Sequence, residues 1–351
     1  MNADYADRRT QFFAIGGRRR SKRVSTGTCA VIVLGVLTAL AAAVPPTPLI
    51  IAHRGASGHR PEHTLEAYRL AVEMGADFIE PDLVSTKDGV LIARHENEIG
   101  DTTNVADRFP DRKRTKTVDG QSITGWFTED FTLAEIKALR ARERLPFRSH
   151  KYDGQFQIAT FDEVIELAHR LGDGRGRPVG IYPETKHPTY FRGIGLPLEE
   201  RLLASLGKYG WNSRESPVFI QSFEQGNLRE LRKKTAVRLI QLVSTATSSM
   251  IEGDGVKRIA EYADGIGAET FLVVPVNRDG SLGAPTDLVT RAHAAGLLVH
   301  VWTVRVEKEF LPAGYGGKVD AQFEQLRRLG VDGVFTDFPD LAVAAYRSAR
   351  E

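Results

Sequence analysis

From residue 49 onward, short apolar segments alternate with amphipathic segments of helical periodicity, and this alternation restricts the possible folds more than any other feature. Uninterrupted apolar segments are typical of strands buried on both faces. Such strands, each followed by a helix, predict a parallel α/β sheet covered by helices. The predicted strands are 49–53, 78–84, 90–95, 179–184, 218–221, 239–242, 265–267, 298–303 and 333–335, and the predicted helices lie near 64–75, 132–140, 161–171, 196–209, 224–235, 255–262, 285–295 and 319–329.

The number of predicted strands favours a closed barrel over an open sheet. Eight or nine strands over about 290 residues suit one β/α barrel of roughly 250 residues with an insertion. The alternation breaks at 97–160, a polar and turn-rich stretch that we predict to be an insertion leaving the barrel after His95. Residues 86–89 contain the Asp-Gly pair of a tight turn, and glycine-rich 172–176 and 314–317 are predicted to be loops.

Residues 1–48 form a leader of different character. The basic cluster Arg18–Arg23 precedes a run without charge, 26–44, which ends in three alanines. These are the parts of a secretory signal, although the run also approaches the ~20 residues that span a bilayer. We therefore expect a cleaved signal peptide or, alternatively, a retained membrane anchor, followed by one barrel domain over 49–345. In both cases the positive-inside rule places that domain outside the cytoplasm, whether secreted, periplasmic or membrane-anchored.

The charge of the chain belongs mostly to this leader. The formal net charge is +2, but residues 1–48 contribute seven basic and two acidic residues, so the remainder is mildly acidic. An acidic body offers no basic surface for nucleic acid, which we exclude as a partner. The single cysteine, Cys29, also lies in the leader, so the body has no disulfide, thiolate metal site or cysteine nucleophile. The sequence indicates no oligomeric state.

Two histidines follow predicted strands directly. His53 ends the first strand and is followed by Arg54, and His95 ends the segment 90–95. Functional groups of a β/α barrel lie at the carboxyl ends of its strands, where both histidines are expected. The unperturbed pKa of histidine, about 6.5, suits it to proton transfer near neutral pH. We therefore predict that His53 and His95 are the proton-transfer pair.

Three carboxylates are predicted at the same end of the barrel. Glu80 and Asp82 are two residues apart, so in a strand both side chains point to the same side. Two such charges repel unless one is protonated or a cation lies between them, and oxygen ligands suit a hard divalent cation. Glu184 is a third strand-terminal carboxylate, and Lys186 lies two residues beyond it. We predict a divalent-cation site at Glu80, Asp82 and Glu184.

This combination of groups indicates phosphoryl chemistry. A cation can stabilise charge on a phosphate oxygen, Arg54 and Lys186 can neutralise the other oxygens, and the histidines can move protons. The sequence contains neither a Walker-type phosphate loop nor a G-x-S-x-G nucleophile elbow. A phosphate site made of separate side chains is therefore expected.

At these residues the chain resembles the glycerophosphodiester phosphodiesterase family, specifically its periplasmic or secreted branch. The similarity follows the family order from about residue 49 to 341, nearly the whole body. The matching segments are His53–Gly58, Pro61–Thr64, Glu80–Gly89 leading to His95, Tyr182–Lys186, Gln221–Phe223, Val301–Val304 and Gly333–Asp337.

The resemblance implies a TIM (β/α)8 barrel with a small insertion after the second histidine. It implies that Glu80, Asp82 and Glu184 bind the cation, calcium in preference to magnesium, that His53 and His95 are the acid/base pair, and that Arg54 and Lys186 lie near the phosphate. Phe223 and Trp302 match residues that line the glycerol side, with barrel core as the alternative interpretation, and Glu62 matches a motif acid of the substrate site that could instead orient the first loop. Glu96 departs from many relatives, which carry aspartate beside the histidine.

The resemblance further implies hydrolysis of a small glycerophosphodiester to glycerol 3-phosphate and an alcohol. We expect His53 to act as acid and His95 as base, although the sequence alone does not orient them. The alternative is the same chemistry on lysophospholipids or on glycerol-phosphate polymers such as teichoic acid. A barrel that only binds is disfavoured because every matched histidine and carboxylate is present.

Overall fold

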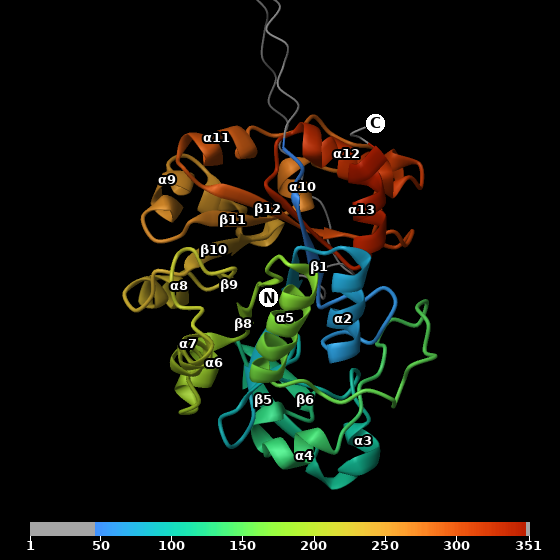
Figure 1. The fold of residues 1–351 in the computed structure, drawn as a ribbon, viewed down its shortest axis with the longest axis vertical. Helices are drawn as coiled ribbons and strands as arrows, with labels where there is room; N and C mark the ends of the chain where they lie inside the picture. Colours follow the sequence, from blue (N-terminus) through green and yellow to red (C-terminus); the bar gives the residue numbers. More distant parts are fainter. Residues whose placement is uncertain (1–45, 349–351) are drawn as a thin grey trace, which may run out of the picture. The chain divides into compact units, whose positions relative to one another are not determined.

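The computed structural model describes residues 46–348, and these contain a sheet whose strands close into a ring. Every neighbouring pair within the ring is parallel, and β13 pairs with β1 as well as with β12. Figure 1 shows the first strand running beside the C-terminal ones. In ring order the strands are β1 Leu49–His53, β2 Phe78–Glu80 with β3 Asp82–Ser85, β7 Gly180–Ile181 with β8 Glu184–Thr185, β9 Phe219–Ser222, β10 Arg238–Val243, β11 Gly265–Glu269, β12 Leu298–Val304 and β13 Gly333–Thr336.

Two of the ring positions are strands interrupted at a proline. Pro81 separates β2 from β3, and Pro183 lies between β7 and β8; neither proline has a backbone N–H to donate. The ladder continues across both breaks, because Glu184 N donates to the carbonyl of Pro81 over 3.0 Å and Gln221 N donates to that of Pro183 over 2.9 Å. The ring therefore has eight parallel positions, which confirms the predicted β/α barrel.

Helices cover the outside of the barrel, and α13, α2 and α5 pack side by side there (Figure 1). Their apolar faces and the outward faces of the strands form one buried layer. The longer helices are α2 Leu65–Met74, α5 Phe161–Arg175, α7 Glu199–Lys208, α8 Gln225–Arg232, α11 Leu288–Ala294, α12 Val319–Arg328 and α13 Pro339–Ser348; the shorter ones are α6 Pro188–Gly193, α9 Gly255–Ala260 and α10 Thr270–Val273.

Two sequence predictions about secondary structure are wrong. The segment predicted as a strand at 90–95 is β4 Leu91–Ala93, which returns antiparallel along β3 after the 86–89 turn and is not one of the barrel's parallel strands. The predicted loop at 172–176 continues α5 to Arg175, with Gly176 in the left-handed conformation at its end. Gly172 is buried in this helix. The chain after the helix approaches it so closely that a Cβ at this position would lie 3.1 Å from the backbone N of Val179.

The segment between β4 and α5 has secondary structure of its own. It contains a two-stranded hairpin, two short helices and a buried apolar set, and it rejoins the barrel where Ala93 N donates to the carbonyl of Ala159 over 2.9 Å. The segment is therefore structured, and Figure 1 shows its helices and hairpin grouped together below α2 and α5. Its elements are α3 Val105–Arg108, β5 Arg114–Val118, β6 Gln121–Gly125 and α4 Leu133–Lys137, and its buried residues include Phe127, Phe131, Ile136 and Leu139.

The interior of the barrel is filled by a separate apolar cluster. One side chain from each of several strands points inward. The hydroxyl of Tyr182 is also hydrogen-bonded to His300 Nδ1 over 2.7 Å. Gly180 leaves room for this packing, since a Cβ there would lie 2.1 Å from the ring of Phe78. The cluster consists of Ile51, Phe78, Tyr182, Phe219, Ile240 and Phe335.

The predicted leader lies almost entirely outside the described residues, which begin at residue 46. Within residues 46–348, no helix is both long enough and apolar enough to cross a membrane. The prediction of a signal peptide or anchor stays a prediction.

Candidate active site

The candidate site is the layer directly above the barrel's apolar filling. Side chains two residues apart in a strand face the same way, so each inward-pointing core residue is followed by an inward-pointing residue nearer the carboxyl end. Five of these positions carry polar groups although they are buried, whereas Ile240 is followed by the apolar Leu242. The pairs, core residue first, are Ile51 with His53, Phe78 with Glu80, Tyr182 with Glu184, Phe219 with Gln221 and Phe335 with Asp337.

Three buried carboxylates meet in this layer. Glu80, Asp82 and Glu184 each offer an oxygen, and these oxygens lie within 4.8 Å of one another. Burial, together with repulsion from Asp82, raises the pKa of Glu80 well above its usual value and that of Glu184 to about 8. Burial opposes the charge of Asp82 as well, but Lys186 and His63 outweigh it and lower the pKa of Asp82.

The donor set fits a divalent cation. Asp82 Oδ1 is buried and has no hydrogen-bond partner within the described residues, so this oxygen has a lone pair available for a ligand. The other carboxylates are held in place: Glu80 accepts from Arg54 N over 2.8 Å and from Gln221 Nε2 over 3.0 Å, and Glu184 accepts from Lys186 Nζ over 2.9 Å. A hard cation with oxygen ligands would compensate three mutually repelling acids.

His63 was not selected from the sequence, yet it holds one of these acids. Its ring is completely buried, with Nε2 2.9 Å from Asp82 Oδ2 and Nδ1 2.8 Å from the hydroxyl of Tyr68. Burial lowers the pKa of His63 to about 4, so the neutral ring donates to Asp82 and accepts from Tyr68. Its place beside Glu62 in a motif was the only sequence signal.

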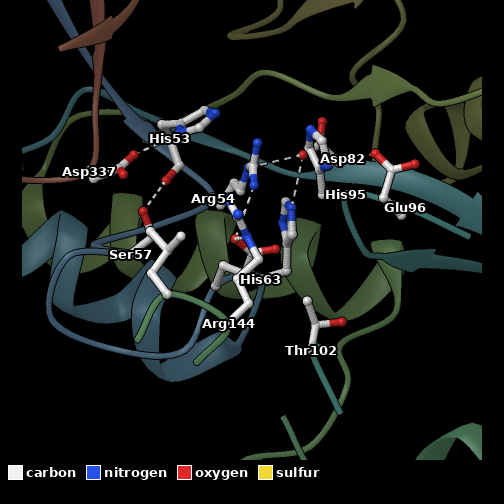
Figure 2. Close-up of polar contacts among 12 residues, drawn as sticks. His53, Arg54, Ser57, His63, Asp82, His95, Glu96, Thr102, Arg144 and Asp337 are labelled. Atoms are coloured by element: carbon white, nitrogen blue, oxygen red, sulfur yellow. Dashed lines mark hydrogen bonds and ion pairs between the residues drawn. The ribbon is translucent and has the colours of Figure 1, made fainter. Parts of the chain in front are cut away.

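His53 is anchored by an acid that is itself held by two arginines. His53 Nδ1 lies 2.6 Å from Asp337 Oδ1 (Figure 2). Asp337 Oδ2 accepts from Arg148 Nη2 over 2.6 Å and from Arg305 Nε over 2.8 Å. Burial opposes the charge of Asp337, but the two arginines outweigh it and keep its pKa well below the usual value. Burial, with Arg54 nearby, lowers the pKa of His53 to about 4. Asp337 was part of a recognised motif without an assigned role.

His95 is anchored in the same way. Its Nδ1 lies 2.8 Å from Glu96 Oε1, and its Nε2 lies 3.4 Å from Lys186 Nζ. Because a lysine ammonium can only donate, Nε2 is the acceptor and Nδ1 carries the proton of the neutral ring. Glu96 thus holds the histidine next to it in the chain. Burial, with Arg54 and Lys186, lowers the pKa of His95.

Arg54 and Glu62 are paired at the start of the first loop. Arg54 has a positive φ of 60°, and its Nη1 donates to Glu62 Oε2 over 3.0 Å while Nε lies 3.5 Å from Asp82 Oδ2. The same oxygen of Glu62 accepts from Arg144 Nε over 3.2 Å. In Figure 2, Arg54 lies between His53 and His95. The structure thus places Glu62 against the two arginines, which fits the loop-orienting interpretation.

Phe223 and Trp302 are in contact with each other near Lys186. Their rings pack edge to face with centroids 5.7 Å apart, and both side chains are half-buried. Lys186 Nζ lies 5.9 Å from the centroid of Phe223, and Trp302 Nε1 donates to the carbonyl of Gly267 over 2.8 Å. The aromatic pair therefore borders the charged site through Phe223, while Trp302 also packs against the barrel's central cluster.

Comparison with known proteins identifies the family of this chain. The model of the glycerophosphoryl diester phosphodiesterase family matches residues 53–341. A glycerophosphodiester phosphodiesterase of Arabidopsis thaliana is 41% identical, covering 83% of this chain and 84% of the relative. Another, of Treponema pallidum, is 32% identical, covering 90% of this chain and 96% of the relative.

Solved structures share the fold. A phosphodiesterase of Oleispira antarctica, in complex with the product sn-glycerol-3-phosphate, superposes with a TM-score of 0.59 at 22% identity, covering 86% of this chain and 97% of that one. A glycerophosphoryl diester phosphodiesterase structure from Silicibacter pomeroyi gives a TM-score of 0.65 at 22% identity, covering 87% and 95%. At this identity the likeness supports the barrel fold.

Proposed function

This chain belongs to the glycerophosphoryl diester phosphodiesterase family, and we propose that it hydrolyses glycerophosphodiesters in a metal-dependent reaction to glycerol 3-phosphate and an alcohol. Phosphodiesterase activity on glycerophosphodiesters follows from relatives that match most of the chain. The observation that supports the finer proposal is the buried cluster of Glu80, Asp82 and Glu184 beside two histidines whose Nδ1 atoms are each held by a carboxylate.

Glu80, Asp82 and Glu184 would hold the cation, which supplies positive charge for a phosphate oxygen when bound. Oxygen-only ligands suit calcium, which we propose in preference to magnesium. Arg54 and Lys186 place two further positive charges beside these acids, where they can bind the remaining phosphate oxygens. Phe223 and Trp302 supply an apolar wall next to Lys186 for the carbon skeleton of the glycerol.

We assign His95 the role of base. Its Nε2 holds the lone pair, which accepts from Lys186 over 3.4 Å; once Lys186 turns to a phosphate oxygen, this lone pair can take a proton from the attacking hydroxyl, either the glycerol 2-hydroxyl or water. We assign His53 the role of acid. In that role its ring must be protonated when it meets the leaving alcohol, and Asp337, with its pKa kept low, favours this charge against burial and Arg54, which lower the pKa of His53. The two histidine side chains are only 11% and 12% exposed, which limits the water that would weaken these interactions.

We also propose that the enzyme works outside the cytoplasm. The support is the composition of the leader: a basic cluster at Arg18–Arg23 followed by a run without charge at 26–44, either cleaved or kept as a tether. Lysophospholipids and teichoic polymers are not proposed as substrates, because the relatives are named for glycerophosphodiesters.

The test is a substrate profile of the purified full chain with calcium present. Glycerophosphocholine, glycerophosphoethanolamine, lysophosphatidylcholine and a glycerol-phosphate polymer are compared by the products that each releases. We expect glycerol 3-phosphate from the first two substrates, and near-complete loss of turnover in His53→Ala and His95→Ala. A higher kcat/KM on lysophosphatidylcholine or on the polymer would overturn the substrate assignment.

A further inference from the structure

The carboxylate that holds His95 is itself held by a histidine outside the predicted site, and a second acid holds that histidine. Glu96 Oε1 lies 2.8 Å from His95 Nδ1, and Glu96 Oε2 lies 3.0 Å from His187 Nε2. The other nitrogen of His187, Nδ1, lies 2.6 Å from Asp119 Oδ2. The side chains of His95, Glu96, His187 and Asp119 therefore form a continuous line of contacts from His95 to the β5–β6 hairpin.

Both outer residues adopt backbone conformations that L-residues seldom use. His187 has a φ of 48° directly after Lys186, and Asp119 has a φ of 48° at the tip of the hairpin, followed by Gly120 at 79°. A two-residue turn with positive φ at both positions is the turn that closes a tight hairpin, and aspartate tolerates its first position. His187 has no such local reason for a positive φ, so its tertiary contacts must hold it there.

The charges along the line are complementary. Burial opposes a charge on His187, but its hydrogen bonds to Asp119 and Glu96 outweigh burial and raise its pKa to about 9. At neutral pH His187 is therefore an imidazolium between two carboxylates. Both oxygens of Glu96 are then occupied by ring nitrogens, one from each histidine, and this leaves the carboxylate one orientation.

Apart from Asp119, most side chains of the β5–β6 hairpin are exposed. Arg114, Thr115 and Thr117 of β5 are exposed, as are Gln121 and Ser122 of β6, so the two strands are not packed into the core along their length. A hairpin of two strands is only marginally stable by itself. The Asp119 contact is thus a specific link between the tip and the residue after Lys186.

We propose that His187 and Asp119 are positioning residues that fix Glu96, and through it the ring of His95, so that the β5–β6 hairpin of the insertion belongs to the working site. This proposal rests on the proposed function, in which His95 takes a proton. With Glu96 held, His95 keeps its proton on Nδ1 and presents the Nε2 lone pair beside Lys186. Without it, the ring can rotate or change tautomer.

Asp119→Gly tests the link with little disturbance of the turn, because glycine accepts the positive φ that Asp119 has. We expect kcat on glycerophosphocholine to fall about ten-fold or more, as for other residues that orient a functional histidine, with KM changing less than about two-fold. Asp111→Asn removes one exposed acid from the same insertion and is the control; it should match the unmodified chain. An unchanged kcat in Asp119→Gly overturns the proposal.

A double-mutant cycle separates positioning from a general effect on the insertion. If Asp119 acts through Glu96, Asp119→Gly should cost nothing further in a Glu96→Ala background. If the substitution only loosens the hairpin, it should lower kcat/KM by the same factor in both backgrounds, and the proposal is then rejected. Failure of the unmodified chain to hydrolyse any glycerophosphodiester would instead refute the proposed function, so the two failures are distinguishable.

Discussion

Arg148 donates from Nη2 to Asp337 Oδ2 over 2.6 Å, which joins the segment before α5 to the acid that follows the last barrel strand. The same arginine donates from Nε to Glu307 Oε1 over 2.6 Å and from Nη1 to the carbonyl of Ser57 over 3.2 Å. Three separate loops are thereby held around His53. The insertion therefore supports the side chains that hold both histidines: Arg148 contacts Asp337, the partner of His53, and Asp119 contacts His187, which holds the partner of His95.

Asp337→Asn should lower kcat by about 100-fold or more, because an amide can donate to Nδ1 of His53 and so favour the wrong tautomer. Steady-state hydrolysis of glycerophosphocholine measures the effect, with circular dichroism as a check of folding. Asp320→Asn, an exposed acid in the first turn of α12, is the matched control and should have normal kinetics. Normal turnover in Asp337→Asn would falsify the assigned role of His53.

Arg148→Ala should lower the free energy of unfolding by about 3 kcal/mol, since it removes a partner from the buried Asp337. The side chain of Arg148 is 6% exposed and that of Asp337 is 2% exposed. Arg142 pairs with Asp107 at the surface, with side chains 40% and 63% exposed, so Arg142→Ala should cost less than about 1 kcal/mol. Denaturant titration of both variants compares them; equal losses would contradict the structural role of Arg148.

Removal of divalent cations should abolish activity, and added calcium should restore it. Calcium should also raise the thermal midpoint of the chelated protein, because a ligand that binds only the folded state stabilises it by mass action. Glu184→Gln should lose both responses, whereas Glu66→Gln, an exposed acid on α2, should keep them. If the thermal midpoint of the unmodified chain does not respond to calcium or magnesium, the cation site is refuted.

Glu143 should make the folded state less stable as the pH rises. Burial raises its pKa from 4.5 to about 7, so the folded state binds this proton more tightly than the unfolded state does. Stability is therefore lost as the pH rises from about 4.5 through about 7, by about 3 kcal/mol. Glu143→Gln, which can still accept from Leu145 N, should be more stable than the unmodified chain at about pH 8 and equal to it at about pH 4.

Denaturation curves at the two pH values measure this difference. Glu252→Gln, at an exposed position, serves as the control and should show the same pH dependence as the unmodified chain. The interpretation of Glu143 fails if its variant gains no stability at the higher pH.

Most of the barrel strands could be predicted because each one corresponds to a short apolar run in the sequence. Apolar runs such as 49–53 and 333–335 bury both faces, and their boundaries agree with β1 and β13 to within a residue. The direction of the strand that precedes His95 depends instead on the hairpin turn at 86–89, and periodicity does not distinguish a returning strand from a new parallel one. For this reason the prediction of a parallel barrel strand at 90–95 is wrong.

The sequence by itself determined the chemical content of the site: strand-end histidines His53 and His95, and carboxylates whose spacing places Glu80 and Asp82 on one face. Only the tertiary structure decided which groups hold them. His53 meets Asp337 across 284 positions, His187 meets Glu96 across 91, and Asp119 meets His187 across 68. Periodicity reports which face of its own element a side chain occupies, whereas these contacts exist because closing the barrel and folding the insertion onto it bring distant loops together.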